Sequence, residues 1–250
     1  MTEWTDLPPR EQWRITQGSL TLARLSWDYS CAVIIAAADE PDERASTASG
    51  FLINLHGSVF LATADHVIDN YIARRTENRY TFLQAGMLGM DATYRVVFRD
   101  PQADVAFISL AGLDISVTDA TVYQPIGTWP PPSPTPGDSV QFCGFPKAFR
   151  DMSRKGEIDF GALPGFAIIQ SVGPGYCTAV IDRTDVQVFG EMQELPPSSK
   201  FGGLSGGPVL LFGRLAYPIV GAVSEVSEKF DILRFATLEG VPMSISPGIP

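Results

Sequence analysis

Histidine is scarce in this chain: His56 and His66 are the only two among 250 residues. A zinc site needs three or four His, Cys or carboxylate ligands at suitable spacing, and the sequence contains neither C-x-x-C nor H-x-x-x-H. It also contains no P-loop and no G-x-G-x-x-G that opens a helix after a strand. We therefore expect neither a bound metal nor a cofactor.

Long apolar runs, disulfide patterns and excess positive charge are also lacking. No stretch of about 20 apolar residues could span a membrane, and the N-terminus has no apolar run of signal-peptide length. The odd set of Cys31, Cys143 and Cys177 is widely spaced, which favours a reducing, cytoplasmic compartment. The net charge of −10 disfavours nucleic-acid phosphates, although an extended or basic polypeptide would not be repelled.

Short β-branched or aromatic segments, bounded by glycine, proline, Asn or Asp, make up most of the chain. Many such strands at intervals of about 8–12 residues predict an all-β sandwich or barrel. A short helix is expected at residues 67–75, after His66, and another in the first thirty residues. The expected strands are 31–37, 48–55, 59–64, 80–85, 93–99, 105–110, 139–145, 166–172, 176–181, 186–190, 207–212, 217–223 and 232–238.

Residues 124–138, QPIGTWPPPSPTPGD, contain six prolines and differ from everything around them. Proline cannot donate to a sheet ladder and stiffens the chain towards polyproline II. We interpret this segment as a linker between two β units, 28–123 and 139–250, that follow an N-terminal extension at 1–27. The alternative is a long surface loop within one domain.

The stretch FGGLSGGPVL, residues 201–210, surrounds Ser205 with four glycines. Glycine clusters mark tight backbone geometry or close approach of a ligand, so this is either a plain turn or a nucleophile beside an oxyanion site. It also matches the nucleophile elbow G-x-S-x-G of α/β-hydrolases. That fold needs a histidine after the serine, and none follows His66, so we exclude it.

A serine hydroxyl is a poor nucleophile until a base of near-neutral pKa, such as histidine, removes its proton. A carboxylate is the group that best holds the imidazole in one tautomer. His66 follows an apolar strand in VFLATADHV, and Asp104 heads an apolar strand in ADVAFISL, with Asp100 a weaker candidate. Taken alone, each has an ordinary structural explanation, a strand-end His or a turn-capping Asp. The order His66, Asp104, Ser205 is that of the chymotrypsin-type double barrel.

Three motifs, ATADHV, ADVAFISL and GLSGGPV, resemble T-A-x-H, D-[IV]-A-x-[IL] and G-x-S-G-G-P of the trypsin-like serine peptidases. The opening VQFCGFP also resembles the second barrel of many bacterial members, and the likeness spans about residues 30–240. The resemblance implies two six-stranded antiparallel Greek-key barrels and a polypeptide substrate. It also implies a triad in which Ser205 attacks, His66 acts as base and then acid, and Asp104 orients His66.

By the same resemblance, the backbone N–H groups of Gly203 and Ser205 form the oxyanion hole. Ser199 lies near the base of the specificity pocket, and the wall and substrate-pairing strand contain Ser224, Glu225 and Val226. The uncharged Ser199 does not support a preference for Arg or Lys, and Val226 narrows the pocket towards small apolar side chains.

In secreted members of the family, the residue just before the nucleophile is an Asp, which binds the new N-terminus that zymogen cleavage releases. In this chain the same position is Leu204. Asp65 beside His66 is also unusual; it either raises the pKa of His66 or faces away from it. Two further functions therefore stay open beside a constitutive endopeptidase. One is a double barrel that only binds peptides or proteins, and the other is a protease switched on by a partner, with the N-terminal thirty residues as a docking piece.

Overall fold

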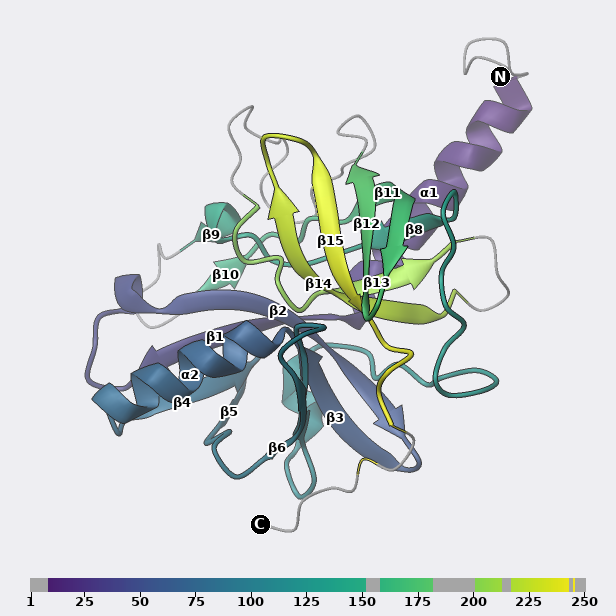
Figure 1. The fold of residues 1–250 in the computed structure, drawn as a ribbon. Helices are drawn as coiled ribbons and strands as arrows, with labels where there is room; N and C mark the ends of the chain where they lie inside the picture. Colours follow the sequence, from purple (N-terminus) through teal and green to yellow (C-terminus); the bar gives the residue numbers. More distant parts are fainter. Residues whose placement is uncertain (1–8, 152–157, 182–200, 213–216, 243–244, 246–250) are drawn as a thin grey trace.

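The computed structural model describes residues 9–151, 158–181, 201–212, 217–242 and 245. Figure 1 shows two β units stacked on one another, with the N-terminal helix α1 (Pro9–Tyr29) reaching away beside the second unit. The predicted strand at 186–190 lies outside the described residues.

The first unit is one antiparallel sheet of seven strands in the order β5-β4-β1-β2-β3-β7-β6. It curls into an open half-barrel that ends at β5 and β6, so this unit is not a closed six-stranded barrel. The largest differences from expectation are that β5 was not predicted and that β6 begins at Val96 rather than residue 93. The strands are β1 (Ser30–Ala37), β2 (Ser46–Leu55), β3 (Ser58–Thr63), β4 (Thr81–Ala85), β5 (Leu88–Met90), β6 (Val96–Asp100) and β7 (Val105–Ser109).

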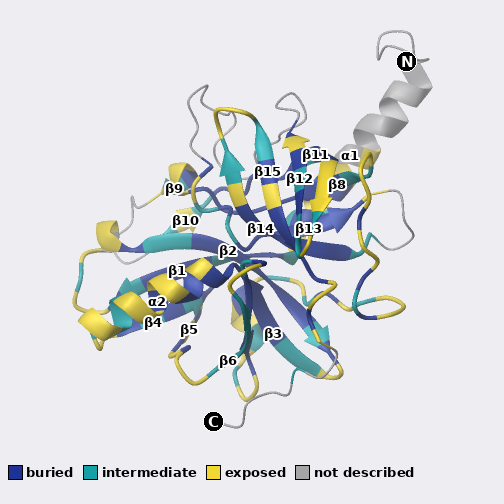
Figure 2. Cartoon of the chain, in the orientation of Figure 1, coloured by how far each residue is buried: buried dark blue, intermediate teal, exposed yellow. Residues whose placement is uncertain are grey.

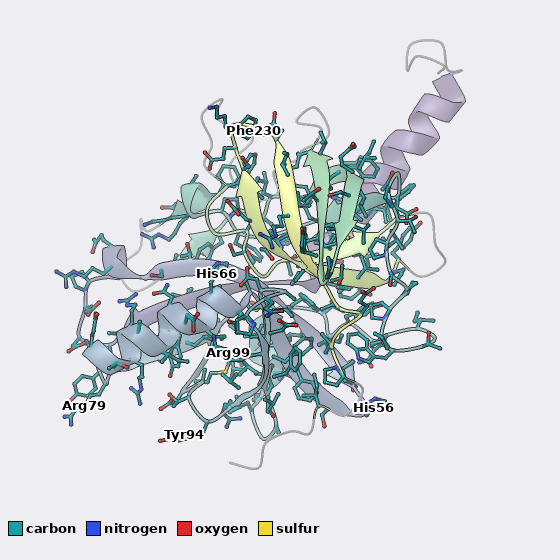
Figure 3. The ribbon with its side chains drawn as sticks, in the orientation of Figure 1. His56, His66, Arg79, Tyr94, Arg99 and Phe230 are labelled. Carbon is teal, nitrogen blue, oxygen red and sulfur yellow. The ribbon has the colours of Figure 1, made fainter. Side chains whose placement is uncertain are left out.

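The hairpin between β2 and β3 turns at His56 and Gly57, which have φ angles of 53° and 85°. Positive φ at both central residues is the type I′ geometry that matches the twist of paired strands, and Gly57 adopts it without steric cost. His56 is exposed at this tip, far from His66 (Figure 3).

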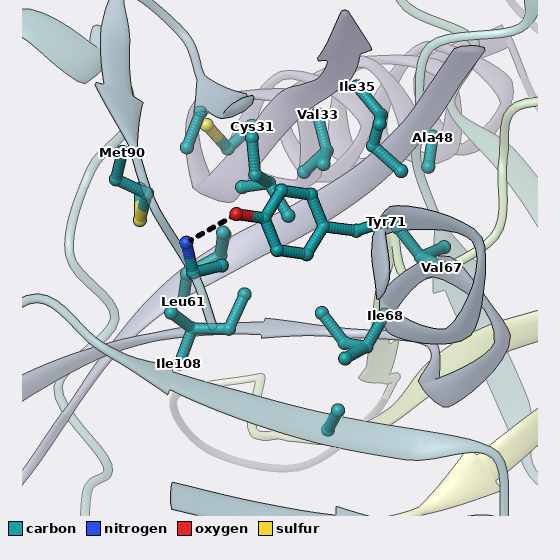
Figure 4. Close-up of a cluster of buried hydrophobic side chains, with 14 of the residues drawn as sticks. Cys31, Val33, Ile35, Ala48, Leu61, Val67, Ile68, Tyr71, Met90 and Ile108 are labelled. Carbon is teal, nitrogen blue, oxygen red and sulfur yellow. Dashed lines mark hydrogen bonds between the residues drawn. The ribbon is translucent and has the colours of Figure 1, made fainter. Parts of the chain in front are cut away.

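Helix α2 (Asp65–Glu77) packs on the first sheet through Tyr71, whose side chain is fully buried. The Tyr71 hydroxyl donates to Asp91 (2.8 Å) and accepts the backbone N–H of Ala92 (3.1 Å), so its polar end is satisfied inside the apolar cluster of Figure 4. Because α2 is fixed on the sheet, its first turn, which contains His66, is fixed as well.

The second unit is a closed six-stranded barrel in the order β11-β12-β15-β14-β13-β8. A two-stranded sheet of β9 (Arg150–Asp151) and β10 (Asp159–Phe160) lies outside this barrel. In the chain as a whole, short 3-10 helices occur at Asp42–Arg44, Ile115–Thr118 and Lys147–Phe149. The barrel strands are β8 (Ser139–Phe142), β11 (Gly165–Gly173), β12 (Tyr176–Ile181), β13 (Pro208–Leu211), β14 (Ile219–Ser227) and β15 (Ile232–Thr237).

An apolar cluster joins the two units, with Phe51 and Phe107 from the sheet and Leu210 and Ile219 from the barrel. Figure 2 shows this junction as a continuous buried zone. Trp129 from the proline-rich segment, 8% exposed, belongs to the same cluster. The predicted all-β double-barrel fold is thus confirmed, whereas the division of the chain at residues 124–138 stays a prediction.

Two α-helices occur in the described part of the chain, α1 and α2, as the sequence predicted in outline. Neither is both long enough and apolar enough to cross a lipid bilayer.

Candidate active site

His66 is the second residue of α2, which follows β3 directly. The first N–H groups of a helix have no partner inside the helix, and the N-cap residue Ala64 offers no side-chain acceptor. The backbone N–H of His66 instead donates to Oδ1 of Asp104, at 3.0 Å. The start of the helix is therefore tied to Asp104. Figure 3 shows His66 on the side of the sheet that faces the barrel.

Asp104 lies in the left-handed region, with φ of 65°, at the end of the turn between β6 and β7. Its backbone N–H donates to the carbonyl of Asp100 (2.8 Å), and Oδ1 of Asp100 accepts the N–H groups of Gln102 and Ala103, both at 3.0 Å. Asp100, the weaker candidate for the acid, thus shapes the turn that presents Asp104.

The side chains of His66 and Asp104 are paired. Nδ1 of His66 lies 2.9 Å from Oδ2 and 3.1 Å from Oδ1 of Asp104. A carboxylate can only accept, so Nδ1 carries the proton, and in the neutral ring Nε2 keeps its lone pair. The hydrogen bond to Asp104 raises the pKa of His66 above its ordinary value, partial burial opposes this, and the charges of Asp104, Asp65 and Asp69 add to it.

Asp65 is 2% exposed and forms an ion pair with Arg99 of β6, at 2.5 Å to Nε and 2.7 Å to Nη2. The same Nη2 also donates to Asp69, one turn further along α2, at 2.6 Å. Arg99 therefore clamps the first turn of the helix that carries His66. Both readings of Asp65 hold in part, because its carboxylate faces Arg99 and its charge still contributes to the raised pKa of His66.

Ser205 lies in the loop that leads into β13, and the backbone on both sides of it is hydrogen-bonded. Its carbonyl accepts the N–H of Ser49 (2.8 Å), and the N–H of Gly206 donates to the carbonyl of Val223 (2.6 Å). The Ser205 hydroxyl donates to the carbonyl of Ser224, at 3.1 Å.

His66, Asp104 and Ser205 all line one open pocket of about 500 Å³ between the two units. Among the described residues, no hydrogen bond joins the Ser205 hydroxyl to His66. Catalytic hydrogen bonds are often long or poorly aligned before a substrate binds. The pocket thus brings the three predicted groups together, but in the described part of the chain the hydrogen bond from the Ser205 hydroxyl to His66 is not formed.

The backbone N–H groups of Gly203 and Ser205 have no acceptor within the described part of the chain. The carbonyl of Gly202 accepts the N–H of Lys147, at 2.7 Å, and the peptide bonds here are trans. In a trans peptide the N–H points opposite to the carbonyl, so the N–H of Gly203 faces away from Lys147. Gly203 has φ of 109°, and a Cβ there would lie 2.6 Å from the carbonyl oxygen of Phe145.

Leu204, at the position of the missing Asp, is 1% exposed and packs in the barrel core with Phe201 and Val209. An ammonium group would have no charged partner there. The loop is therefore held by apolar burial at this residue rather than by an ion pair.

The predicted wall residues Ser224, Glu225 and Val226 line the same pocket, on β14. Ser224 is 7% exposed, and its hydroxyl is buried without a hydrogen-bond partner among the described residues. Gly203 lines a smaller adjoining pocket of about 190 Å³ together with His66 and Ser205. Ser199 lies outside the described residues.

The three thiols offer no competing nucleophile. Cys31, Cys143 and Cys177 are all buried and free, and burial raises the pKa of Cys31 and Cys143 to about 12 and that of Cys177 to about 11. A thiol needs to ionise to attack, so all three groups are inert at neutral pH.

Sequence reasoning missed three residues around the site: Ser49, Arg99 and Arg234. Arg234 lines the pocket and stacks over the ring of Tyr176, at 4.4 Å. The alternation of apolar and polar residues in ILRFAT could have placed Arg234 on the outer face of the barrel. No comparable local signal pairs Arg99 with Asp65 or Ser49 with the loop of Ser205.

The family model of the trypsin-like peptidase domain matches residues 48–213. A solved Glu endopeptidase has a TM-score of 0.50 and 16% identity, covering 85% of this chain and 86% of that one, and it supports the same fold. Human heparin binding protein (TM-score 0.49, 14% identity, 89% and 95% coverage) and the tobacco vein mottling virus protease (0.47, 12%, 86% and 79%) are also similar. No curated protein sequence shows significant similarity to the chain.

Proposed function

Because this chain belongs to the trypsin-like peptidase domain family, we propose that it is a serine endopeptidase with Ser205, His66 and Asp104 as its catalytic triad. The observation that supports this most directly is the pairing of His66 Nδ1 with Asp104, 2.9 Å apart, in the pocket that Ser205 also lines. A histidine held in this tautomer has Nε2 available as a base.

In the proposed reaction, the Ser205 hydroxyl rotates from the Ser224 carbonyl towards Nε2 of His66 and attacks the scissile carbonyl carbon. Its proton passes to Nε2, and the imidazolium is stabilised by Asp104. The tetrahedral oxyanion accepts the N–H groups of Gly203 and Ser205, which have no other acceptor in the described chain. Nε2 then protonates the leaving amine, so that the C–N bond breaks and an acyl ester of Ser205 remains.

A water molecule completes the cycle by the same steps. His66 takes one proton from the water, the hydroxide adds to the acyl carbon, and Ser205 leaves with a proton returned by His66. Hydrolysis thus consumes one water per peptide bond and regenerates the resting enzyme.

We propose an extended polypeptide as the substrate. β13 pairs with β14 only as far as Ala222, opposite Pro208, so the edge of β14 beyond Val223 is not covered by that strand. An extended peptide can add to such an edge by backbone hydrogen bonds. Val226 lies on this stretch, half-buried in the pocket wall, and we retain small apolar side chains as the expected preference.

Labelling with a fluorophosphonate tests this proposal, because the reagent needs an activated serine. We expect rapid labelling of the wild type and loss of labelling in both Ser205→Ala and His66→Ala, with all three proteins equally folded by circular dichroism. If the folded wild type is not labelled, the constitutive protease is rejected.

One observation favours a second candidate, a protease switched on by a partner. The Ser205 hydroxyl is hydrogen-bonded to the carbonyl of Ser224 rather than to His66. The Ser205 side chain must therefore rotate before His66 can accept its proton. Fluorophosphonate labelling that appears only after addition of a partner protein would support this candidate. A folded protein that is not labelled under either condition would support a peptide-binding double barrel.

A further inference from the structure

Ser49 of β2 is fully buried, and it contacts the loop of Ser205 from the other unit. Its hydroxyl donates to the carbonyl of Gly203 (2.7 Å) and accepts the backbone N–H of Phe145 (2.8 Å). Its own backbone N–H donates to the carbonyl of Ser205, at 2.8 Å. One serine of the first unit therefore holds the loop through both its side chain and its backbone.

The backbone of Ser49 is free for this because β3 is shorter than β2. The ladder between the two strands ends at the pair Phe51 and Ala62. Ser49 lies two residues beyond this pair, so its N–H reaches the Ser205 carbonyl instead of a neighbouring strand. Thr63 donates to the Ser49 carbonyl (2.8 Å), which fixes the orientation of the Ser49 backbone.

Four consecutive carbonyls of the loop are each hydrogen-bonded. Gly202 accepts from the N–H of Lys147, Leu204 from the N–H of Gly207 (2.9 Å), and Ser205 from the N–H of Ser49. These three bonds come from backbone donors, whereas the Ser49 hydroxyl is the one donor to the carbonyl of Gly203 in the part of the chain that the structure describes.

From this pattern we infer that Ser49 is a positioning residue for the oxyanion hole, an inference that rests on the proposed peptidase function. The N–H of Gly203 lies in the peptide plane between Gly202 and Gly203, which the bond from Lys147 holds, and the N–H of Ser205 lies in the plane between Leu204 and Ser205. The plane between Gly203 and Leu204 contains the carbonyl that Ser49 holds, and it joins the other two planes and so sets the relative orientation of the two N–H groups. A glycine at φ of 109° has no side chain to resist rotation of these planes. The Ser49 hydroxyl restrains this middle plane at its carbonyl (2.7 Å), and the N–H of Leu204 in the same plane makes a longer bond to the carbonyl of Phe201 (3.3 Å).

The backbones of Gly144 and Gly206 pack closely against Ser49. A Cβ at Gly144 would lie 2.7 Å from the Ser49 hydroxyl oxygen, and a Cβ at Gly206 would lie 2.1 Å from the Ser49 carbonyl oxygen. Removal of the hydroxyl would leave two buried groups, the Gly203 carbonyl and the Phe145 N–H, without this partner. Rotation of the Gly203 peptide is then the expected response.

The kinetic test is Ser49→Ala, with Ser30→Ala as the matched control. Ser30 is also a buried serine, on the neighbouring strand β1; its hydroxyl bonds the carbonyl of Ser26 and the thiol of Cys143, and among the described residues it makes no hydrogen bond to residues 202–205. Loss of one oxyanion donor typically lowers kcat about 100- to 1000-fold. Since Ser49 acts through Gly203, we expect kcat of Ser49→Ala to fall about 10- to 100-fold, with KM changed less than about threefold.

A second readout separates positioning from general destabilisation. Among the described residues, Ser49 forms no hydrogen bond to His66 or Asp104. The pKa of His66, followed by the NMR signal of its ring, should therefore be the same in the wild type and Ser49→Ala. Equal kcat in the wild type and Ser49→Ala, or an equal loss in Ser30→Ala, would overturn the inference while the peptidase function stands.

A structural readout does not depend on activity. In the amide NMR spectrum, Ser49→Ala should shift or broaden the signals of Gly203 and Ser205, and Ser30→Ala should leave them in place. Unchanged loop signals in a folded Ser49→Ala overturn the inference even if the wild type proves inactive. Shifted loop signals in an inactive protein would support the positioning role and reject only the proposed function.

Discussion

His66 donates to Asp104 twice, from its backbone N–H at 3.0 Å and from ring Nδ1 at 2.9 Å to the nearer carboxylate oxygen. One carboxylate therefore fixes both the start of helix α2 and the tautomer of the imidazole. Loss of its charge should affect catalysis far more than the fold.

We predict that Asp104→Asn lowers kcat about 10,000-fold, the size of effect known for this change in a serine peptidase triad. The amide nitrogen would face Nδ1 and favour the tautomer with the proton on Nε2, which cannot act as a base. Hydrolysis of a peptide substrate at pH 8 measures the loss. A fall smaller than about tenfold would mean that Asp104 does not orient His66.

The pH dependence of acylation should follow His66. Only the neutral imidazole acts as a base, and the hydrogen bond to Asp104 raises the pKa of His66. The rate of fluorophosphonate labelling should therefore rise with pH through a midpoint above about 6.5, the ordinary value for histidine. A midpoint at or below that value would contradict the pairing in solution.

The same shift predicts a pH-dependent stability. A raised folded-state pKa means that the folded protein binds this proton more tightly than the unfolded chain does. The resulting stabilisation is complete below about pH 6.5 and is lost as the pH rises through the folded-state pKa of His66. Urea unfolding of the wild type and His66→Gln should therefore differ more at pH 5.5 than at pH 9.

Arg99 should matter for stability because it neutralises Asp65, which is 2% exposed. Arg99→Gln leaves that carboxylate buried without its ion pair, and we expect a loss of about 2 kcal/mol in the free energy of unfolding. Arg75→Gln is the control, since Arg75 pairs with the exposed Asp91 and its loss should cost less than about 1 kcal/mol. Urea unfolding of both variants measures the difference, and equal losses would show that Asp65 is adequately solvated.

Gly206 should tolerate no side chain. It has φ of 89°, and a Cβ would lie 2.3 Å from the Thr63 hydroxyl and 2.1 Å from the Ser49 carbonyl oxygen. Gly206→Ala should lower the free energy of unfolding by at least about 2 kcal/mol, through backbone strain and overpacking. Gly202→Ala is the matched control, because a Cβ there meets no atom within 4 Å. Similar thermal unfolding of the two variants would contradict the close packing at Gly206.

The sequence predicted the fold and combined His66, Asp104 and Ser205 in one hypothesis. Each of the three lies in a recognisable motif, beside an apolar strand or among glycines. The structure places the three around one pocket, and their catalytic roles stay a proposal. The short strand β5 was missed because its three residues, with Gly89 in the middle, are too few to show an alternation. That the first sheet stays open depends on pairing between distant strands, which local patterns do not encode.

Ser49 shows a different limit of sequence reasoning. In ASGFLINL it is one polar residue at the start of an apolar strand, and its partner Gly203 is 154 residues away in the chain. The contact exists only because the two units pack together and β3 ends early. The same holds for Arg99, whose partner Asp65 the sequence could only assign to the vicinity of His66.

An active-ester substrate shows directly whether Ser205 forms an acyl intermediate. We predict a burst of the phenolate product equal to the enzyme concentration, and peptide mapping by mass spectrometry after an acid quench should place the acyl group on Ser205. A folded protein with no burst and no adduct, or with the adduct on another residue, would rule out Ser205 as the nucleophile.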